Sequence, residues 1–294
     1  TTSFRWFSTP GLLRIHAGRR SLFLDGGRGR NPNWTLTTVP SSIAAIDQIT
    51  RMRQRLAHRG PDDSGTWQNH FGESSVALGH TRLSILDLSE LGHQPMVSQS
   101  GDVVIAYNGE VYNHRELRRE LEREGCRFRS DCDTEVVLEA YRVWGDDAFA
   151  RLNGMFAIAI WDGRRERLVL ARDRLGIKPL YYRFADGLLT FASELGALRE
   201  HPRFRREIRR SALETYLRFG WTTGREAIYA DTWRVLPGHL LVWEAGTILE
   251  RPYWRLVDQG PSEDPGSYDE IVERLEQLLG DAVELFDQWR SIAV

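Results

Sequence analysis

The chain has 294 residues, a formal net charge of −2 and 41% hydrophobic residues. This size suits one large domain or two smaller ones, and the balanced charge gives no sign of nucleic acid or an anionic membrane as a partner. No apolar run approaches membrane-spanning length. The only cysteines, Cys126 and Cys132, are close together and lack metal-ligand spacing. We therefore expect no structural disulfides, no bound metal and a cytoplasmic location.

Residues 1–40 are atypical in composition. They are rich in Arg, Ser, Thr and Gly, and they contain a single acidic residue, Asp25. This composition fits an organelle-targeting segment, a disordered extension or translation from a wrong start. We therefore interpret residues 1–40 as disordered or non-native and place the first domain after them.

Regular structure is predicted from about residue 42. Apolar residues from Ile43 to Leu56 recur every three or four positions, which predicts an amphipathic helix. The helix ends before Gly60-Pro61, because proline breaks the helical hydrogen-bond pattern. Two apolar strands follow, over residues 76–80 and 103–106, and a helix is predicted to begin near Asp133.

The centre of the chain is rich in predicted strands. Runs over residues 156–161, 168–171, 180–182 and 189–192 are joined by short turns, which favours antiparallel sheets. Together with the helices they predict an α+β domain over residues 41–200. Residues 201–257 are interpreted as a connecting segment with a hairpin around Ala245-Gly246. Residues 258–294 are interpreted as a linker and a helix that opens a truncated second domain.

Polar residues follow the two early strands. Asn108 and Gly109 come after the strand at 103–106, where the Asn amide and the Gly N–H could both stabilise an oxyanion. The alternative is a simple turn, for which Asn-Gly is common. Arg82 follows the strand at 76–80, and its guanidinium could bind a carboxylate in a bidentate manner. The alternative is an arginine on a solvated strand end.

Two acidic residues complete this set. Glu110 and Asp133 could together hold an ammonium group, although Asp133 could instead be the N-cap of its helix. A guanidinium for a carboxylate, two acids for an amine and oxyanion donors for an amide together describe an amino-acid amide. The sequence therefore indicates a site for glutamine or asparagine.

From about Ile43 to about Gly280 the chain resembles glutamine-dependent asparagine synthetases, in particular their class II glutamine amidotransferase domain, which is an N-terminal-nucleophile hydrolase. The resemblance implies a four-layer αββα sandwich with antiparallel sheets, followed by the start of a truncated α/β synthetase domain. The motifs that carry it are His58-Arg-Gly-Pro-Asp62, His80-Thr-Arg-Leu-Ser84, Tyr107-Asn-Gly-Glu-Val-Tyr-Asn113, Asp133-Thr-Glu135, Leu152-Asn-Gly-Met-Phe-Ala157, Arg172-Asp-Arg-Leu-Gly-Ile-Lys-Pro-Leu-Tyr-Tyr182, Phe191-Ala-Ser-Glu194, Leu236-Pro-Gly-His239 and Pro252-Tyr-Trp254.

The resemblance also implies a role for each matching residue. Arg82 would bind the α-carboxylate of glutamine, and Glu110 and Asp133 its α-amine. Asn108 and Gly109 would form the oxyanion hole. The remaining implied residues are Leu83 and Ile85, which would line the pocket, and Arg59 and Asp62, which would brace the nucleophile.

The implied function is hydrolysis of L-glutamine to supply ammonia for ATP-dependent amidation of aspartate to asparagine. No cofactor is implied for the glutaminase domain; ATP and Mg²⁺ are expected only in the synthetase domain, and a homodimer is one expected assembly.

The chain also departs from the family. The family's nucleophile is an N-terminal Cys followed by Gly-Ile, and this chain has no Cys-Gly-Ile. Thr1 could act with its own amine as base, but it lies too far upstream of His58. The family's Ser-Gly-Gly-x-Asp-Ser ATP loop is also absent. The alternative function is therefore a catalytically inactive, glutamine-binding or regulatory module.

Overall fold

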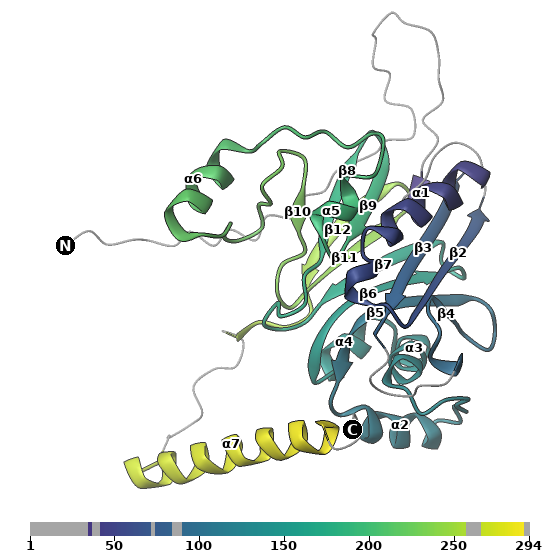
Figure 1. Ribbon diagram of the computed structural model, residues 1–294. Helices are drawn as coiled ribbons and strands as arrows, with labels where there is room; N and C mark the ends of the chain where they lie inside the picture. The colour runs from purple at the N-terminus through teal and green to yellow at the C-terminus, as the bar shows by residue number, and fades with distance from the viewer. Residues whose placement is uncertain (1–34, 37–41, 72–73, 84–89, 257–265, 291–294) are drawn as a thin grey trace, which may run out of the picture.

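The computed structural model describes residues 35–36, 42–71, 74–83, 90–256 and 266–290 (Figure 1). Their strands form two six-stranded sheets that lie face to face between layers of helices. This is the αββα sandwich that the sequence resemblance predicted. Of the described helices, none combines the length and the apolar character that a membrane span requires.

The first sheet, which we call the β5 sheet, has antiparallel neighbours throughout its described pairs. Its strands in spatial order are β12 (Thr247–Pro252), β11 (His239–Glu244), β7 (Arg167–Arg172), β6 (Gly154–Asp162), β5 (Val103–Val111) and β4 (Met96–Val97). The outer face of this sheet packs against helices α2 (His114–Arg123), α3 (Asp133–Trp144) and α4 (Ala148–Arg151).

The second sheet, which we call the β3 sheet, is mixed. The two-residue strand β1 runs parallel to both of its neighbours, whereas antiparallel sheets were predicted. The strands in spatial order are β10 (Trp233–Arg234), β8 (Tyr181–Ala185), β9 (Leu188–Ala192), β1 (Thr35–Leu36), β3 (Ser74–Arg82) and β2 (Asp63–Phe71). Helices α1 (Ser42–Gln54) and α5 (Leu195–Leu198) cover its outer face. The remaining helices are α6 (Arg210–Phe219) and α7 (Tyr268–Arg290), with short 3₁₀ turns at Ala57–Arg59, Glu90–Gly92 and Gly145–Asp147.

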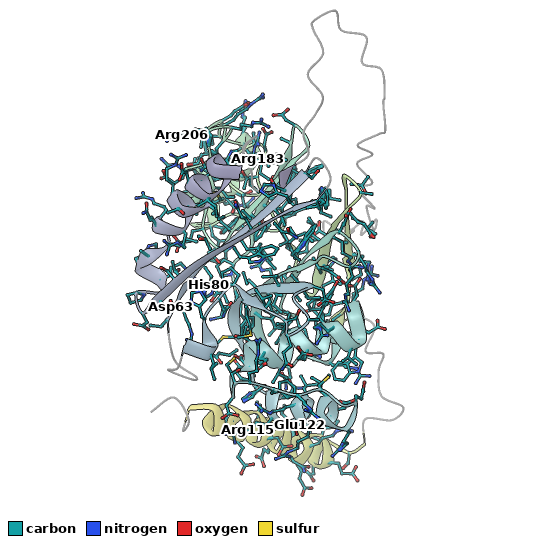
Figure 2. The ribbon with its side chains drawn as sticks, turned by 90° about the vertical axis from the view of Figure 1, so that its right-hand side faces the viewer. Asp63, His80, Arg115, Glu122, Arg183 and Arg206 are labelled. Carbon is teal, nitrogen blue, oxygen red and sulfur yellow. The ribbon has the colours of Figure 1, made fainter. Side chains whose placement is uncertain are left out.

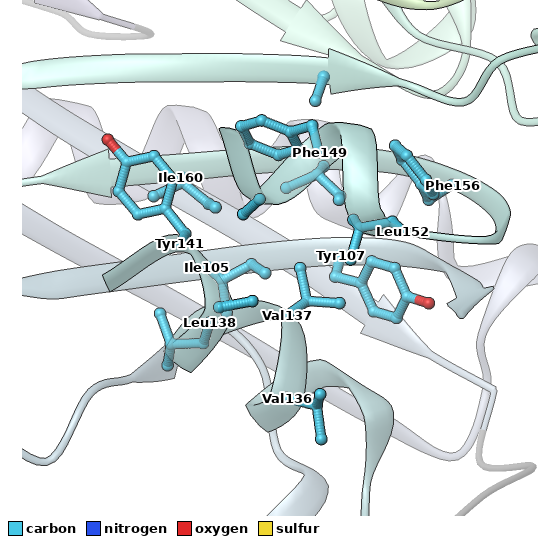
Figure 3. Close-up of a cluster of buried hydrophobic side chains, with 14 of the residues drawn as sticks. Ile105, Tyr107, Val136, Val137, Leu138, Tyr141, Phe149, Leu152, Phe156 and Ile160 are labelled. Carbon is cyan, nitrogen blue, oxygen red and sulfur yellow. The ribbon is translucent and has the colours of Figure 1, made fainter. Parts of the chain in front are cut away.

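Strand β6 is buried on both faces. Phe156, Ile158 and Ile160 pack in the cluster under helix α3. Figure 3 shows Phe156 and Ile160 with aromatic and aliphatic residues of that helix and of β5. Ala157 and Ala159 alternate with them and face the other sheet. Double-sided burial explains why this strand reads as a continuous apolar run rather than an alternating one.

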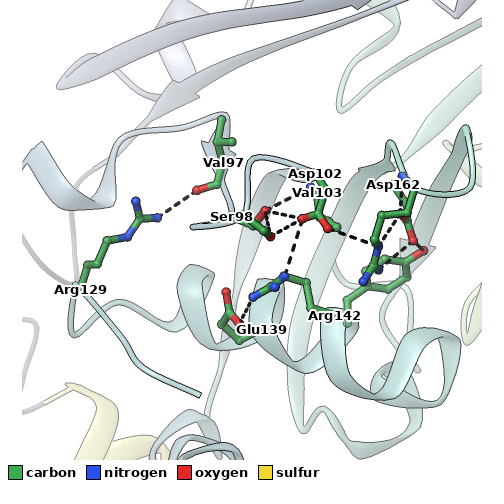
Figure 4. Close-up of polar contacts among 11 residues, drawn as sticks. Val97, Ser98, Asp102, Val103, Arg129, Glu139, Arg142 and Asp162 are labelled. Atoms are coloured by element: carbon green, nitrogen blue, oxygen red, sulfur yellow. Dashed lines mark hydrogen bonds and ion pairs between the residues drawn. The ribbon is translucent and has the colours of Figure 1, made fainter. Parts of the chain in front are cut away.

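A polar network fixes the start of β5 to neighbouring elements (Figure 4). Asp102 accepts a hydrogen bond of 2.9 Å from Ser98 and lies 3.8 Å from Nε of Arg142 on helix α3. It also lies 3.6 Å from Arg164, whose guanidinium binds the fully buried Asp162 at the end of β6. These contacts anchor β5 at the end of the strand that lies away from Asn108.

The loop after β7 is organised around one carboxylate. Asp173 is 1% exposed, and its two oxygens accept the backbone N–H groups of Leu175 (3.1 Å), Ile177 (2.8 Å), Lys178 (2.9 Å) and Phe156 (3.3 Å). A carboxylate that accepts several buried N–H groups replaces the water that those donors have lost. The Asp of the Arg172-Asp-Arg-Leu-Gly motif is therefore explained by its structural role as the hydrogen-bond acceptor for the backbone of this loop.

The domain boundary predicted at residue 200 does not coincide with a structural break. Strands β11 and β12 complete the β5 sheet, because Leu240–Val242 are buried against β7, and β10 extends the β3 sheet. The hairpin predicted around Ala245-Gly246 is confirmed by the β11–β12 pairing. Of residues 1–40 only Thr35–Leu36 are described, and most of the predicted linker at 258–267 also lies outside the described residues.

Candidate functional site

A cavity of about 330 Å³ opens between the two sheets, beside the second half of β5 and the end of β3. Small residues on the inner face of the β5 sheet leave this space, because Ala106, Ala157 and Ala159 line it without filling it. The cavity brings together residues from β3, β5 and α3 that are far apart in the sequence. These are the residues that the sequence singled out: Arg82, Asn108, Gly109, Glu110 and Asp133.

Asn108, Gly109 and Glu110 lie within a strand, so the alternative of a simple turn at this position is wrong. Strand β5 continues from Val103 to Val111, because β6 pairs with it along this whole length. Gly109 is required by this pairing: a Cβ at this position would lie 2.7 Å from the Cα of Phe156 and would collide with the preceding carbonyl. The glycine therefore reflects the close approach of the neighbouring backbone.

The second half of β5 has an open edge beside the cavity, because β4 pairs only with residues 104 and 105. Residues of an antiparallel strand point their N–H groups alternately to the two sides. The N–H of Tyr107 donates to Oε1 of Gln94 (2.7 Å) and that of Val111 to Oδ2 of Asp133 (3.0 Å), both at this edge. Gly109 lies between them and lines the cavity, so its N–H faces space that a ligand can occupy.

Asp133 is the first residue of helix α3, and Cys132 takes the N-cap position. The Asp133 carboxylate is 5% exposed and accepts the Tyr107 hydroxyl (2.6 Å) and the Val111 N–H, so it joins the helix to β5. Burial raises the pKa of Asp133 above its ordinary value, although these hydrogen bonds oppose the shift. Glu110 is buried in the same cavity. Two buried carboxylates on one cavity are stabilised by a cation between them.

Arg82 is held at the end of β3 by close backbone packing. Its side chain is buried, and a Cβ at Gly92 would lie 2.5 Å from its Cζ, so the guanidinium occupies the space that this glycine leaves. A Cβ at Gly60 would lie 2.6 Å from the backbone N of Arg82. The N–H of Asp62 donates to the Arg82 carbonyl oxygen (3.1 Å). The His58–Asp62 motif thus supports the backbone of Arg82.

The other predicted site residues are placed differently. Arg59 lines the cavity and donates to Oε1 of Glu194 (3.0 Å), and Leu83 lines it with a largely exposed side chain. The side chain of Asp62 is not part of the lining, and Ile85 lies outside the described residues. Within the described ranges, no group of three or more His, Cys, Asp or Glu side chains is placed to bind a metal ion.

The structure adds His80 and Gln94 to the site, which sequence reasoning missed. His80 lies on β3 (Figure 2). It precedes Arg82 by two positions, so both side chains lie on the same face of the strand. Its Nε2 lies 2.9 Å from the carbonyl oxygen of Tyr107, across the gap between the two sheets. Burial lowers the pKa of His80 to about 4. The two-residue spacing from Arg82 was the signal that could have found it.

Two histidines with a lowered pKa predict a loss of stability in mild acid. Burial lowers the pKa of His80 and of His201 from 6.5 to about 4, so the unfolded chain takes up these protons first. Their stabilising effect is complete above about pH 6.5 and is lost as the pH falls to about 4, with roughly 3 kcal/mol as the largest value for each. Urea unfolding at a series of pH values measures it, and His201→Asn should flatten the curve. A free energy of unfolding that stays constant from pH 7 to pH 4.5 would contradict it.

The fold and the cavity define a class of protein. The chain shares its αββα sandwich with a solved amidotransferase structure. Residues 36–254 match the model of the glutamine amidotransferase domain family. The chain belongs to this family, as its motifs predicted.

Three relatives illustrate the similarity. The chain is 37% identical over 238 residues to asparagine synthetase (glutamine-hydrolyzing) 3 of Bacillus subtilis, covering 80% of this chain and 38% of that protein. It is 34% identical over 245 residues to amidase chyE of Penicillium rubens, covering 82% of this chain and 35% of that protein. The glutamine phosphoribosylpyrophosphate amidotransferase structure from B. subtilis shares the fold, with a TM-score of 0.52 at 21% identity over 75% of this chain and 48% of that one. The chain thus spans less than half the length of these relatives.

Proposed function

We propose that this domain binds L-glutamine in the cavity between the sheets and stabilises the oxyanion formed at its side-chain amide. This proposal is supported by the residues that line one cavity: they supply one guanidinium, two carboxylates and the backbone N–H of Gly109, which faces the cavity. Arg82 binds the α-carboxylate, and Glu110 and Asp133 bind the α-ammonium group. These charged groups fix the amino-acid end of the ligand, so its amide reaches Asn108 and Gly109.

The oxyanion donors are the side-chain amide of Asn108 and the N–H of Gly109. Loss of one such donor costs on the order of 10²–10³ in rate. We assign no nucleophile among the described residues. Cys132 lines the cavity, but it is 2% exposed, burial raises the pKa of its thiol, and an internal cysteine has no free α-amine to act as base. Arg59 and Asp62 are proposed to brace the catalytic end of the site.

We further propose that the released ammonia serves the ATP-dependent amidation of aspartate to asparagine. The B. subtilis relative, named as a glutamine-hydrolyzing asparagine synthetase, supports this assignment. ATP and Mg²⁺ would bind in a synthetase region. The fungal relative is named an amidase, so a different ammonia acceptor is the competing assignment. A second candidate function is glutamine binding without turnover, which the burial of Cys132 favours.

Calorimetric titration tests the binding function. L-Glutamine should bind, whereas glutaramic acid, which lacks the α-amine, and 4-aminobutyramide, which lacks the α-carboxylate, should each bind at least about tenfold more weakly. Equal affinity for all three ligands would overturn the proposed site. Release of glutamate is then compared with that of Arg82→Ala: a rate above this variant shows turnover, and equal rates with retained binding favour the binding module.

Replacement of Gly92 by alanine should weaken glutamine binding without unfolding the protein. The new Cβ would lie 2.5 Å from Cζ of Arg82, and the flexible side chain can move away. Loss of a charge-assisted hydrogen bond costs about 1.5–3 kcal/mol, which is roughly 10–100-fold in affinity. Gly196→Ala is the matched control, because its nearest neighbours are 3.7 Å away. Equal glutamine affinity in the two variants would show that Gly92 does not position Arg82.

A further inference from the structure

Gln94 is a buried residue of the cavity that the proposed function leaves without a role. It is 5% exposed, and it lines the cavity at the open edge of β5. Its Oε1 accepts the N–H of Tyr107 (2.7 Å), and its Nε2 donates to Oγ1 of Thr134 (3.3 Å). Because a backbone N–H can only donate, the amide oxygen must be the end that faces Tyr107. The amide of Gln94 is therefore held in one orientation between strand β5 and helix α3.

These two hydrogen bonds join the two ends of the proposed site. Tyr107 directly precedes Asn108, one of the proposed oxyanion donors. Thr134 directly follows Asp133, which is proposed to bind the α-ammonium group. Gln94 belongs to neither element, because it lies in the segment before β4. A side chain from a third segment thus links the amide end of the site to its ammonium end.

A second link joins the start of α3 to the same edge of β5. Asp133 accepts the hydroxyl of Tyr107 (2.6 Å) and the N–H of Val111 (3.0 Å). Gln94 and Asp133 therefore bind this edge on the two sides of Gly109. The apolar packing of α3 on the β5 sheet is not directional, whereas hydrogen bonds have preferred distances and angles. The position of the helix start along β5 is thus fixed by these polar contacts at both ends.

We propose that Gln94 is a positioning residue that sets the spacing between the ammonium site and the oxyanion donors to the length of glutamine, and so excludes asparagine. This inference rests on the proposed function. Asparagine carries the same groups but is shorter by one methylene, so its amide does not reach Asn108 and Gly109 when its amine is bound. One methylene changes discrimination by about 10–200-fold, and a misplacement of about 1 Å can cost about 100-fold in rate.

Two variants of Thr134 test this link while Gln94 stays in place. Thr134→Val keeps the size and the branched shape but offers no acceptor to Nε2 of Gln94, whereas Thr134→Ser keeps the hydroxyl. The affinity ratio of L-glutamine to L-asparagine, measured by calorimetry, should fall about three- to tenfold in Thr134→Val, as for the loss of one ordinary hydrogen bond. In Thr134→Ser the ratio should stay within about twofold of the wild-type value.

A double variant shows whether Thr134 acts through Gln94, since Thr134 itself lines the cavity. Gln94→Met has a similar length and removes both hydrogen bonds, so it should lower the ratio at least as much as Thr134→Val. Adding Thr134→Val to Gln94→Met should then change the ratio no further. Effects of the two substitutions that simply add would overturn the role of Gln94.

The outcomes distinguish this inference from the function on which it rests. If the wild-type protein does not bind L-glutamine, the proposed function fails. If it binds L-glutamine and asparagine equally, or if Thr134→Val keeps the wild-type ratio or weakens both ligands by the same factor, only the role of Gln94 is overturned. The test does not depend on the folding of Gln94→Met, because Thr134→Val leaves the hydrogen bond from Tyr107 in place.

Discussion

Replacement of Asp173 by alanine is expected to destabilise the protein by about 3–5 kcal/mol, because it leaves four backbone N–H groups, one of them in the buried strand β6, without their acceptor. The carboxylate accepts four backbone N–H groups, from Phe156, Leu175, Ile177 and Lys178. Phe156 belongs to β6, beside the cavity wall, so the loss of these bonds should affect both the loop and the central sheet. Urea unfolding followed by circular dichroism measures the change.

The variant Asp173→Asn is the matched control for this prediction. Its remaining oxygen can accept two of the N–H groups, whereas its NH₂ faces the donors of the other two. We expect a loss of stability between zero and that of the alanine variant. The exposed Asp131 provides a neutral reference, because its side chain is 97% exposed. A loss below about 1 kcal/mol in Asp173→Ala would show that water replaces the carboxylate, since surface changes have effects of that size.

Replacement of Asp133 by asparagine should lower the affinity for L-glutamine by roughly 10–100-fold, because hydrogen bonds to charged groups contribute about 1.5–3 kcal/mol. The substitution removes the charge that the α-ammonium group requires. The remaining amide oxygen can still accept the Tyr107 hydroxyl and the Val111 N–H, which both bond to a single oxygen of Asp133. The thermal unfolding temperature should therefore change little.

The ligand provides the control for this second prediction. Glutaramic acid lacks the α-amine, so Asp133→Asn should bind it as the wild-type protein does. The affinities of the wild-type protein and of Asp133→Asn for the two ligands form a double-mutant cycle, which measures the coupling between Asp133 and the α-amine of the ligand. If the substitution weakens both ligands equally, Asp133 acts through the structure of the cavity and not through the ammonium group.

Much of the fold could be predicted from local patterns. Apolar runs joined by turns of two to four residues indicated the hairpins β6–β7, β8–β9 and β11–β12, and all three pairings are present. The parallel strand β1 was not predicted, because two residues carry no periodic signal. The participation of β10–β12 in the two sheets depends on long-range pairing with β8 and β7, which residue spacing does not reveal.

The sequence predicted which residues form the candidate site, but it did not predict their local backbone structure. Arg82, Asn108, Gly109, Glu110 and Asp133 were each chosen for their chemistry, and all line one cavity. The turn expected at Asn108-Gly109 is part of a strand, because β6 overrides the turn preference of that dipeptide. The contribution of His80 depends on the distance between the two sheets, which is fixed only when the sandwich has formed. The contribution of Gln94 depends on how the segment before β4 lies along the edge of β5.

The shortness of β4 has a consequence for how this site can be lost. Unpaired sheet edges are usually covered, since they invite further strands. Here β4 begins only at Met96, and side chains cover the edge at Tyr107 and Val111 on either side of Gly109. An insertion before Met96 that extended β4 by four residues, so that its pairing with β5 reached Gly109, would bond the Gly109 N–H to backbone. Such a change would close the oxyanion hole while leaving every site residue in place, so sequence identity at the site residues would no longer report activity.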